Sequence, residues 1–389
     1  MRTFAVLGLW FLIACGNGNA KPEQQQSQQR PGDAKTADAD PAKLAGVQLY
    51  TTFCAHCHGA DGKGYKADNA PSLVNKTFLE SADDDYIKRS IAAGRPGTSM
   101  AGYSAKVGGP LDDAALDRLV GWIRSQGPAS GPVPASTPGD AVAGLAVYNL
   151  HCMKCHGDAG TRSSAVHLAN PQFLATATDA FMRYAVVMGR PGTPMEAFGT
   201  KLKPKEIDDV VSYIRTYQKT GGAEVGSLPA PTGKEPVVIN PKGKNPVWSK
   251  LRRDPGGTVD RYVSVDEVNQ AFKDKKRMVI IDARPASDWM KAHIEGAVSI
   301  PYHDLARLSE IPDDVWAIAY CACPHHLSGD VVNALIAKGH KKALVLDEGI
   351  LEWHRRGYPV TAAPGVLPPP KEGGVVPSGG HGHEGHAHP

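Results

Sequence analysis

Residues 45–59 read AGVQLYTTFCAHCHG, and residues 143–157 read AGLAVYNLHCMKCHG. Both stretches open with Ala-Gly, carry a tyrosine one helical turn before the first cysteine, and end with Cys-x-x-Cys-His-Gly. The recurrence of so similar a segment indicates that the chain contains two copies of one structural unit.

Two further landmarks repeat in the same order. The sequence GRPGTSM at 94–100 returns as GRPGTPM at 189–195, and LDRLVGWIRS at 116–125 returns as IDDVVSYIRT at 207–216. The first and last landmarks have apolar residues at i, i+3, i+4 and i+7, which is typical of an amphipathic helix. Each copy is therefore predicted to begin and end on such a helix.

Cys-x-x-Cys-His is the pattern by which a polypeptide attaches c-type haem. Two thiols one helical turn apart add to the two vinyl groups of the porphyrin, and the next residue places an imidazole under the iron. A zinc site or a dithiol pair is the alternative for a single motif, but two copies, together with the export signal described below, favour haem. The predicted attachment and proximal residues are Cys54, Cys57, His58, Cys152, Cys155 and His156.

The opposite face of each iron needs a further ligand. In the first copy Met100 has no rival, because His56 lies inside the attachment loop and cannot reach the far face. In the second copy Met195 is predicted, since it lies in the loop that both copies share. The other side chains formally available there are His151, His167, Met153, Met182 and Met188.

At these residues the two blocks resemble class I cytochrome c domains. The resemblance implies an all-α fold in which Gly46 or Gly144 lets the first helix approach Trp122 or Tyr213 on the last. It also implies two covalently attached haem c groups, one in each domain, with their iron held by histidine and methionine. Such ligation raises the reduction potential relative to two imidazoles and suits electron transfer.

Residues 259–363 have a different character. Short β-branched or apolar runs alternate with helical segments, which predicts an α/β domain with a mostly parallel sheet. The expected strands are 278–282, 297–301, 316–320 and 343–347.

Three segments of this block resemble landmarks of the rhodanese family in the family's order: DARPASDW at 282–289, HIEGA at 293–297 and EGILEWHRRGYP at 348–359. The resemblance implies a cysteine at the end of the central strand, in a loop whose backbone N–H groups bind anions and stabilise a thiolate. Cys321 occupies that position. It would take a sulfane sulfur from thiosulfate or polysulfide and hold it as a persulfide.

The loop departs from the family's usual Cys-x-x-Gly-x-Arg-Ser, because residues 321–328 read CACPHHLS. Pro324 replaces glycine and removes one N–H donor. His326 stands near the usual arginine and is charged only when protonated. Cys323 is a second thiol able to displace the persulfide, so Cys321, Cys323 and His326 are the candidate catalytic residues.

Two alternatives remain open for this loop. Cys321, Cys323, His325 and His326 offer ligands for zinc or a soft metal, although their close spacing makes a four-ligand cage awkward. The loop could instead belong to an inactive rhodanese fold that serves as a docking module.

The N-terminus predicts export. Residues 1–14 combine a basic start with an apolar run too short to span a bilayer. The sequence LIAC at 12–15 resembles the lipobox of bacterial lipoproteins, in which Cys15 becomes lipidated; the alternative is an ordinary signal peptide cleaved near Ala14 or Ala20. We therefore expect a periplasmic or cell-surface protein that is anchored to a membrane by lipid.

Composition and linker sequences complete the predicted organisation of the 389 residues. The net charge of +3 does not favour a nucleic-acid partner. The predicted boundaries are a signal peptide at 1–14, a flexible tether at 15–41, cytochrome c domains at 42–126 and 139–220, linkers at 127–138 and 221–258, a rhodanese-like domain at 259–363 and a His-rich disordered tail at 364–389.

Two hypotheses for function follow. In the first, an exported dihaem cytochrome transfers electrons to and from redox partner proteins, and Cys321 binds or transfers sulfane sulfur from inorganic sulfur compounds. In the second, the chain is a non-enzymatic electron carrier whose rhodanese-like domain is an inactive docking module. Sulfur transfer by itself is not an oxidation, so the sequence alone does not join the haems and Cys321 in one cycle.

Overall fold

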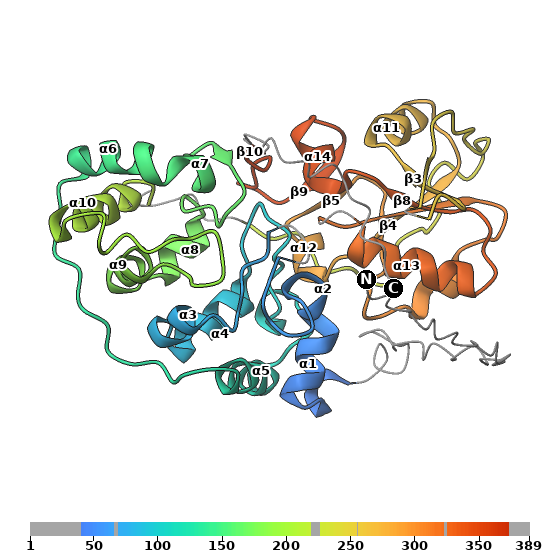
Figure 1. The fold of residues 1–389 in the computed structure, drawn as a ribbon. Helices are drawn as coiled ribbons and strands as arrows, with labels where there is room; N and C mark the ends of the chain where they lie inside the picture. The colour runs from blue at the N-terminus through green and yellow to red at the C-terminus, as the bar shows by residue number, and fades with distance from the viewer. Residues whose placement is uncertain (1–39, 66–68, 219–225, 255, 323–324, 373–389) are drawn as a thin grey trace, which may run out of the picture.

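The computed structural model describes residues 40–65, 69–218, 226–254, 256–322 and 325–372. Two helical domains lie side by side, and an α/β domain packs against the first of them (Figure 1). The first helical domain consists of η1 (Pro41–Lys43), α1 (Gly46–Phe53), α2 (Ala55–His58), α3 (Lys76–Ser81), α4 (Asp84–Ala93), η2 (Ala105–Val107) and α5 (Asp113–Ser125).

The second helical domain repeats this arrangement. Asn75 and Asn170 cap α3 and α8 with their side chains, and Asp83 and Thr178 cap α4 and α9 in the same way. Its elements are α6 (Ala141–His151), α7 (Met153–His156), β1 (Thr161–Arg162), α8 (Pro171–Thr176), α9 (Asp179–Met188) and α10 (Pro204–Arg215).

The first and last long helices of each helical domain cross at a glycine. A Cβ atom on Gly46 would lie 2.3 Å from the carbonyl oxygen of Arg118, and one on Gly144 would lie 2.0 Å from that of Asp209. Because real Cβ atoms do not approach so closely, only glycine permits these crossings. The prediction of an all-α fold with this crossing is confirmed for both domains.

The α/β domain is built on a six-stranded sheet with the order β2-β3-β8-β7-β4-β6. All neighbours are parallel except β2 and β3. Its elements are β2 (Arg252–Arg253), β3 (Asp260–Val263), α11 (Val265–Lys273), β4 (Met278–Asp282), α12 (Ala286–Trp289), β5 (Ala292–Ile294), β6 (Val298–Ser299), η3 (Ala306–Glu310), β7 (Trp316–Tyr320), α13 (His326–Ala337), β8 (Ala343–Leu346), α14 (Gly349–Arg355) and β9 (Val360–Ala362).

Helices cover both faces of this sheet. Val331 and Leu335 of α13 share one apolar cluster with Ile281, whereas Val268 of α11 and Trp353 of α14 share the other with neighbouring strand residues. Burial on both faces explains why the central strands are continuously apolar. The predicted α/β domain with a mostly parallel sheet is confirmed, and each of the four expected runs contains a strand.

Two sets of backbone strand pairings involve segments outside the predicted domains. Residues 226–254, expected as a linker, include β2, and the backbone N–H of Ile239 donates to the carbonyl of Met278 at 2.9 Å. The strand β10 (Lys371–Glu372) pairs in parallel with β1 of the second helical domain. Two-residue strands leave no apolar alternation in a sequence, so no pattern predicts them.

The predicted signal peptide, Cys15 and the four tail histidines lie outside the described residues. Within the described ranges, no helix has both the length and the apolar character needed to span a membrane.

Candidate functional site

The attachment motif of the first helical domain lies where α1 meets α2. His58 is buried, and its Nδ1 lies 2.8 Å from the carbonyl oxygen of Pro71. Burial lowers the pKa of His58, and the contact with Pro71 opposes that effect only in part. The ring is thus held neutral with Nε2 left to bind a metal, as a haem-binding imidazole requires.

The second motif has the same geometry. Nδ1 of His156 lies 2.7 Å from the carbonyl oxygen of Val166, and burial lowers the pKa of this histidine too. The hydroxyl of Tyr148 donates to the carbonyl of Gly157 at 2.6 Å, as the hydroxyl of Tyr50 does to that of Gly59. The spacing between tyrosine and motif, which the two copies share, therefore lets the tyrosine hydroxyl fix the attachment loop.

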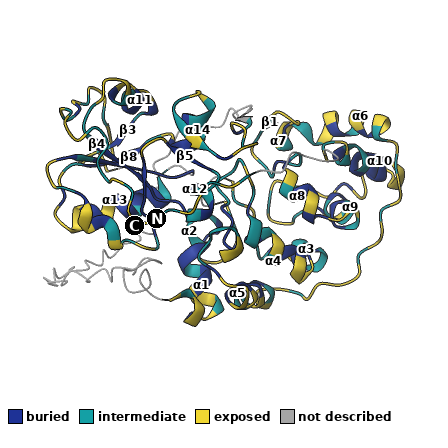
Figure 2. Ribbon diagram, turned by 180° about the vertical axis from the view of Figure 1, so that it is seen from behind, coloured by how far each residue is buried: buried dark blue, intermediate teal, exposed yellow. Residues whose placement is uncertain are grey.

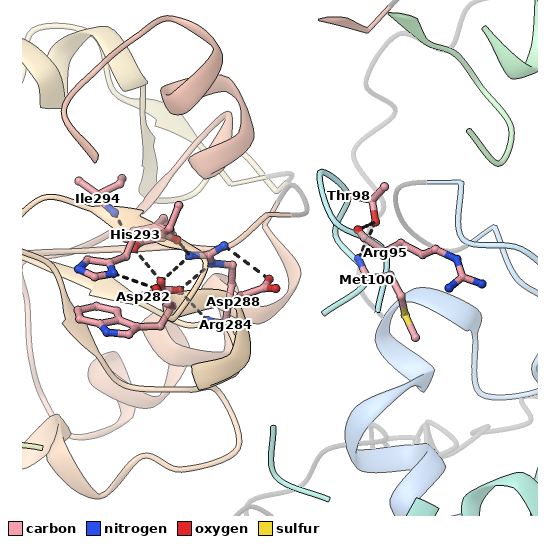
Figure 3. Close-up of polar contacts among 11 residues, drawn as sticks. Arg95, Thr98, Met100, Asp282, Arg284, Asp288, His293 and Ile294 are labelled. Carbon is pink, nitrogen blue, oxygen red and sulfur yellow. Dashed lines mark hydrogen bonds and ion pairs between the residues drawn. The ribbon is translucent and has the colours of Figure 1, made fainter. Parts of the chain in front are cut away.

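The methionine loops of the two domains are folded alike. The N–H of Met100 donates to the hydroxyl of Thr98 at 3.1 Å, and the N–H of Met195 donates to that of Thr193 at 3.2 Å. Each methionine carbonyl accepts from the N–H of the loop's arginine, Arg95 or Arg190. Figure 3 shows this turn for Met100, whose side chain leaves the loop on the side of the adjoining helix.

The rival ligands of the second domain are placed differently. Nε2 of His167 lies 2.6 Å from the carbonyl oxygen of Asp158, and Met182 is buried in the core on α9. Met188, at the end of α9, and His151 are exposed. Met195 packs against the small apolar cluster of Val186, Phe198 and Ile207, and the loop that it shares with Met100 still favours it as the ligand.

The two helical domains brace each other's methionine loops. The amide of Asn75 donates to the carbonyl of Pro191 at 2.8 Å, and the amide of Asn170 donates to the carbonyl of Pro96 at 2.8 Å. The guanidinium of Arg190 lies 5.4 Å from the ring centre of Phe181 in the same junction. Each methionine loop is therefore held against the N-terminus of α3 or α8 of the other domain.

The attachment loop of the first domain is covered by the α/β domain. Nε2 of His56 lies 2.9 Å from a carboxylate oxygen of Asp330 on α13, and its ring lies 5.5 Å from that of Tyr302. The ring of Phe53 contacts that of His303 at a centroid distance of 5.4 Å. Burial lowers the pKa of His303 to about 4, so its ring is neutral in this interface.

The corresponding loop of the second domain is open. Cys155 is exposed, whereas Cys54 is buried and Cys57 half-buried. Leu150 is 77% exposed, whereas Thr52, at the same place in the first copy, is 8% exposed. Figure 2 shows exposed residues along α6, far from the α/β domain, and Figure 1 shows α2 beside α12 and α13.

Cys321 follows β7 and is 1% exposed. Its Sγ lies 3.3 Å from the hydroxyl of Ser328 on α13, two residues before Asp330. Its carbonyl accepts from the N–H of Ile350 at 3.0 Å, and a Cβ atom on Gly349 would lie 2.5 Å from that carbonyl oxygen. The strand end, α13 and the start of α14 therefore converge on the cysteine.

His325 is anchored beside this cysteine. Its Nε2 lies 2.7 Å from a carboxylate oxygen of Asp347, and its ring lies against that of Tyr262, tilted by 36°, at a centroid distance of 4.2 Å. Arg252 donates to Asp347 at 2.9 Å and lies over the ring of Tyr262. Burial alone would raise the pKa of Asp347, but its bonds with His325 and Arg252 hold that pKa well below the usual range.

The sequence motif does not predict this anchor and favours His326 instead. His326 is half-buried at the first position of α13. Asp347 had a recognisable signal, since it ends an expected parallel strand at the edge where ligands usually bind. Arg252 and Tyr262 had none, because they come from strands that no apolar run predicts.

A buried ionic network supports the same edge of the sheet (Figure 3). Arg284 donates to both carboxylate oxygens of Asp282 at 2.9 and 2.7 Å, and the hydroxyl of Tyr320 donates to Asp282 at 2.8 Å. Burial raises the pKa of Asp288 to about 6, although Arg284 lies 3.5 Å away. The resemblance segment 282–289 thus fixes the position of the loop after β4.

A cavity of about 250 Å³ lies between the first helical domain and the α/β domain. Its lining includes Gly108 of the former and Ser299, His303 and Arg307 of the latter, but not Cys321. The cavity is therefore separate from the candidate sulfur site.

The metal alternative for the cysteine loop gains no support. Within the described ranges, no group of three or more His, Cys, Asp or Glu side chains is arranged to hold a metal ion. Cys323 and Pro324 lie outside those ranges.

Profiles of three known families match successive parts of the chain. The family described as cytochrome c matches residues 44–127, and cytochrome c oxidase, cbb3-type, subunit III matches residues 139–214. The rhodanese-like domain family matches residues 264–356. The first two matches imply covalently bound haem c.

The curated relatives share only part of their length with this chain. The cbb3-type cytochrome c oxidase subunit FixP of Azorhizobium caulinodans is 27% identical over 45% of this chain and 59% of its own length. The cbb3-type cytochrome c oxidase subunit CcoP of Rubrivivax gelatinosus is 28% identical over 53% of this chain and 67% of its own length. The cytochrome bc1 complex cytochrome c subunit of Mycobacterium leprae is 27% identical over 52% of this chain and 73% of its own length.

Solved structures give partial superpositions. A chain of the reducing HAO-like protein complex of Kuenenia stuttgartiensis is 20% identical, and the match covers 46% of this chain and all of that one with a TM-score of 0.33. A rhodanese-like domain from Anabaena is 21% identical over 27% of this chain and 80% of its own, with a TM-score of 0.25. Because both TM-scores lie below 0.5, these superpositions carry no functional argument.

Proposed function

The chain carries two cytochrome c domains followed by a rhodanese-like domain, and from this we propose that it conducts electrons between sulfur chemistry at Cys321 and an external redox partner. The observation that carries this proposal is the contact between the first attachment loop and α13. His56 meets Asp330 at 2.9 Å, and Ser328 on the same helix meets Cys321 at 3.3 Å.

The side chains available for haem attachment and iron ligation fit two covalently bound haems. Each domain offers two free thiols, a neutral imidazole held through Nδ1 and a methionine on a braced loop. When bound, each haem supplies one-electron oxidation and reduction at its iron. The residues that would hold the groups are Cys54, Cys57, His58 and Met100 in the first domain and Cys152, Cys155, His156 and Met195 in the second.

Cys321 performs the sulfur step. Its thiolate attacks the outer sulfur of thiosulfate, an S–S bond to Cys321 forms, and sulfite leaves with the electron pair of the broken S–S bond. No electron is released by this transfer. The bound sulfur, Cys321–S–S⁻, then joins a second thiol as Cys321–S–S–S–R, which releases two electrons and one proton. Cys323 or a small thiol is the second thiol.

The interfaces provide a route for these two electrons. The first attachment loop lies against the rhodanese-like domain through His56 and Phe53. The methionine loop of each cytochrome domain lies against the other domain, at the helix ends capped by Asn75 and Asn170. With haem held by the residues named above, the electrons would pass one at a time from the first domain to the second, and from there to an external acceptor.

The proposal is tested by mixing the oxidised holoprotein with thiosulfate or polysulfide without oxygen. We expect the haem absorbance to show reduction in the wild type and at most about one-tenth of that rate in Cys321→Ser. Dithionite should reduce both proteins fully, which controls for loss of haem. Equal rates in the two proteins would show that the sulfur compound bypasses Cys321.

The burial of Cys321 favours a second function, an electron carrier with an inactive rhodanese-like module. At 1% exposure the thiol has little access to solvent. Mass spectrometry of the reduced protein after polysulfide treatment separates the two functions: a sulfur atom added to the Cys321 peptide supports transfer, and its absence under conditions that label an active rhodanese supports the docking module.

We place this protein outside the cytoplasm, anchored through lipid on Cys15. The support is the lipobox-like sequence at 12–15 and the two haem attachment motifs. A Cys15→Ser chain with a replacement cleavage site should be soluble after export. Its persistence in the membrane fraction would point to retention by a partner complex.

A further inference from the structure

The loop after Cys321 lacks an arginine, and an arginine from outside the family match at 264–356 reaches the same edge of the sheet. We propose that Arg252 binds the negatively charged end of the sulfur donor, the sulfonate group of thiosulfate, while Cys321 attacks the outer sulfur. This inference rests on the proposed sulfur step at Cys321. It assigns the preference for anionic donors to a segment that the sequence predicts as a linker.

Strand register brings the arginine close to the cysteine. In the parallel pair of β7 and β8, Ala319 lies opposite Val345. Two residues farther along each chain, Cys321 and Asp347 occupy equivalent positions at the carboxyl edge of the sheet, where neighbouring strands lie about 4.8 Å apart. Nε of Arg252 donates to Asp347 at 2.9 Å. The guanidinium of β2 therefore extends past β3 to the end of β8, the strand next to that of Cys321.

Contacts on one edge and one face hold this guanidinium in place. Nε and Nη2 of Arg252 donate to the two carboxylate oxygens of Asp347, and its Cζ lies 4.3 Å from the ring centre of Tyr262. Glu348, the next residue, accepts from the backbone N–H of Val265 at 2.9 Å instead. No acceptor for Nη1 is present among the described residues, and the Arg252 side chain is 51% exposed. Nη1 is therefore available to an oxyanion on a guanidinium whose orientation is already fixed.

His325 links this arginine to the loop that begins at Cys321. Its Nε2 bonds to the carboxylate of Asp347, and its ring lies against that of Tyr262, the two residues that also hold Arg252. The φ of His325 is 71°, a left-handed conformation that costs energy for a residue other than glycine. The shared contacts stabilise this conformation and keep the loop and the guanidinium together.

Arginine suits the chemistry of an anionic donor better than the loop's own side chains. Thiosulfate brings two negative charges to a thiolate, so its binding requires a cation. His326 carries positive charge only when protonated, and Pro324 has no N–H to donate. Arg252 keeps its charge at neutral pH and offers N–H groups that match a sulfonate oxygen.

The first experiment measures steady-state sulfur transfer from thiosulfate to cyanide by the full-length holoprotein. In the second step cyanide takes the outer sulfur of Cys321–S–S⁻ as thiocyanate, and the Cys321 thiolate returns. Arg252→Gln should raise the KM for thiosulfate about tenfold and leave kcat within about twofold, because it removes a charged hydrogen bond made equally before and during the reaction. Arg252→Lys, which keeps the charge, should raise KM less.

Arg253→Gln is the matched control for the first experiment. It removes the same charge from the neighbouring residue of β2, whose side chain is 66% exposed and pairs with Asp260. Its KM and kcat should equal those of the wild type. Circular dichroism and covalent haem content must match in all variants, which excludes a folding defect. Equal KM values for Arg252→Gln and Arg253→Gln would overturn the inference.

The second experiment measures charge selectivity at the thiol without sulfur transfer. In a Cys323→Ser background, the Cys321 thiolate displaces iodide from iodoacetate or from neutral iodoacetamide, and mass spectrometry of the Cys321 peptide gives both rates. Arg252→Gln should lower the ratio of the iodoacetate rate to the iodoacetamide rate about fivefold, and Arg253→Gln should not change it. An equal loss of both rates in Arg252→Gln would show that the arginine only positions the loop, which would overturn the inference.

The two experiments separate failure of this inference from failure of the proposed function. If the wild type transfers sulfur but Arg252→Gln keeps the wild-type KM and alkylation ratio, the proposed function stands and the inference is wrong. If the wild type transfers no sulfur, the proposed function fails together with the donor assigned here, and a ratio that still depends on Arg252 supports an anion contact alone. No alkylation by either reagent would show that Cys321 is closed to donors and would overturn both.

Discussion

The two cytochrome domains share a fold but present different surroundings to their attachment loops. Tyr50 and Tyr148 make the same bond, and Met100 and Met195 lie on the same turn. The first loop is nevertheless packed against the rhodanese-like domain, whereas the second is exposed. The two copies of the unit thus differ in what covers the attachment loop among the described residues, and His56, within the motif of the first copy, makes one of the covering contacts.

The largest expected effect concerns the methionine ligands. Met100→Ala and Met195→Ala should each abolish the methionine–iron absorption of one haem and lower its potential by on the order of 100 mV or more. Optical redox titration of both variants measures this. An unaffected spectrum for Met195→Ala would transfer the assignment in the second domain to His167, which would first have to leave Asp158.

The helix crossings of the two domains should be equally intolerant of a side chain larger than glycine. Gly46→Ala and Gly144→Ala place a Cβ within 2.3 and 2.0 Å of a carbonyl oxygen, and each should lower the free energy of unfolding by about 3 kcal/mol. Gly121→Ala on α5 is the control, because its Cβ would meet no atom within 4 Å. Denaturant unfolding that ranks Gly144→Ala with this control would refute the close crossing.

Acid should weaken the interface between the first cytochrome domain and the rhodanese-like domain. Burial holds the pKa of His303 at about 4, below its usual value near 6.5. The unfolded chain therefore binds this proton first, so the contribution of His303 is complete above pH 6.5 and is lost as the pH falls towards 4.

His303→Phe tests this effect while keeping a ring against Phe53. Between pH 7 and pH 4.5, the wild type should lose about 2 kcal/mol more unfolding free energy than the variant. Denaturant titrations at the two pH values measure the difference. The same pH dependence in both proteins would exclude His303 as its origin.

The smallest effect is expected for the contact between His56 and Asp330. Asp330→Asn should cost at most about 1 kcal/mol, because the Asp330 side chain is 47% exposed. Hydrogen exchange should become faster in α2 but stay unchanged in α7, which has no such partner among the described residues. Unchanged exchange in both helices would show that apolar contacts alone hold the interface.

Much of the fold was predictable because its signals are local. The motif at 54–58, its repeat and the aromatic–glycine crossing each depend on residues within one domain, and the central strands are continuously apolar. The contact of His56 with Asp330 joins residues far apart in sequence, and neither residue type is unusual. The same holds for the anchor of His325, which joins Arg252 of β2 to Asp347, the residue after β8.

The order in which polysulfide reduces the two proposed haems tests the central claim most directly. Rapid-freeze electron paramagnetic resonance should follow the ferric signals of the two proposed haems, and Met100→Ala and Met195→Ala should assign each signal to its domain. The signal of the first domain should disappear before that of the second, and Cys321→Ser should slow both. Earlier loss of the second domain's signal, or rates that are indifferent to Cys321, would contradict the assignment of the first domain to the rhodanese-like site.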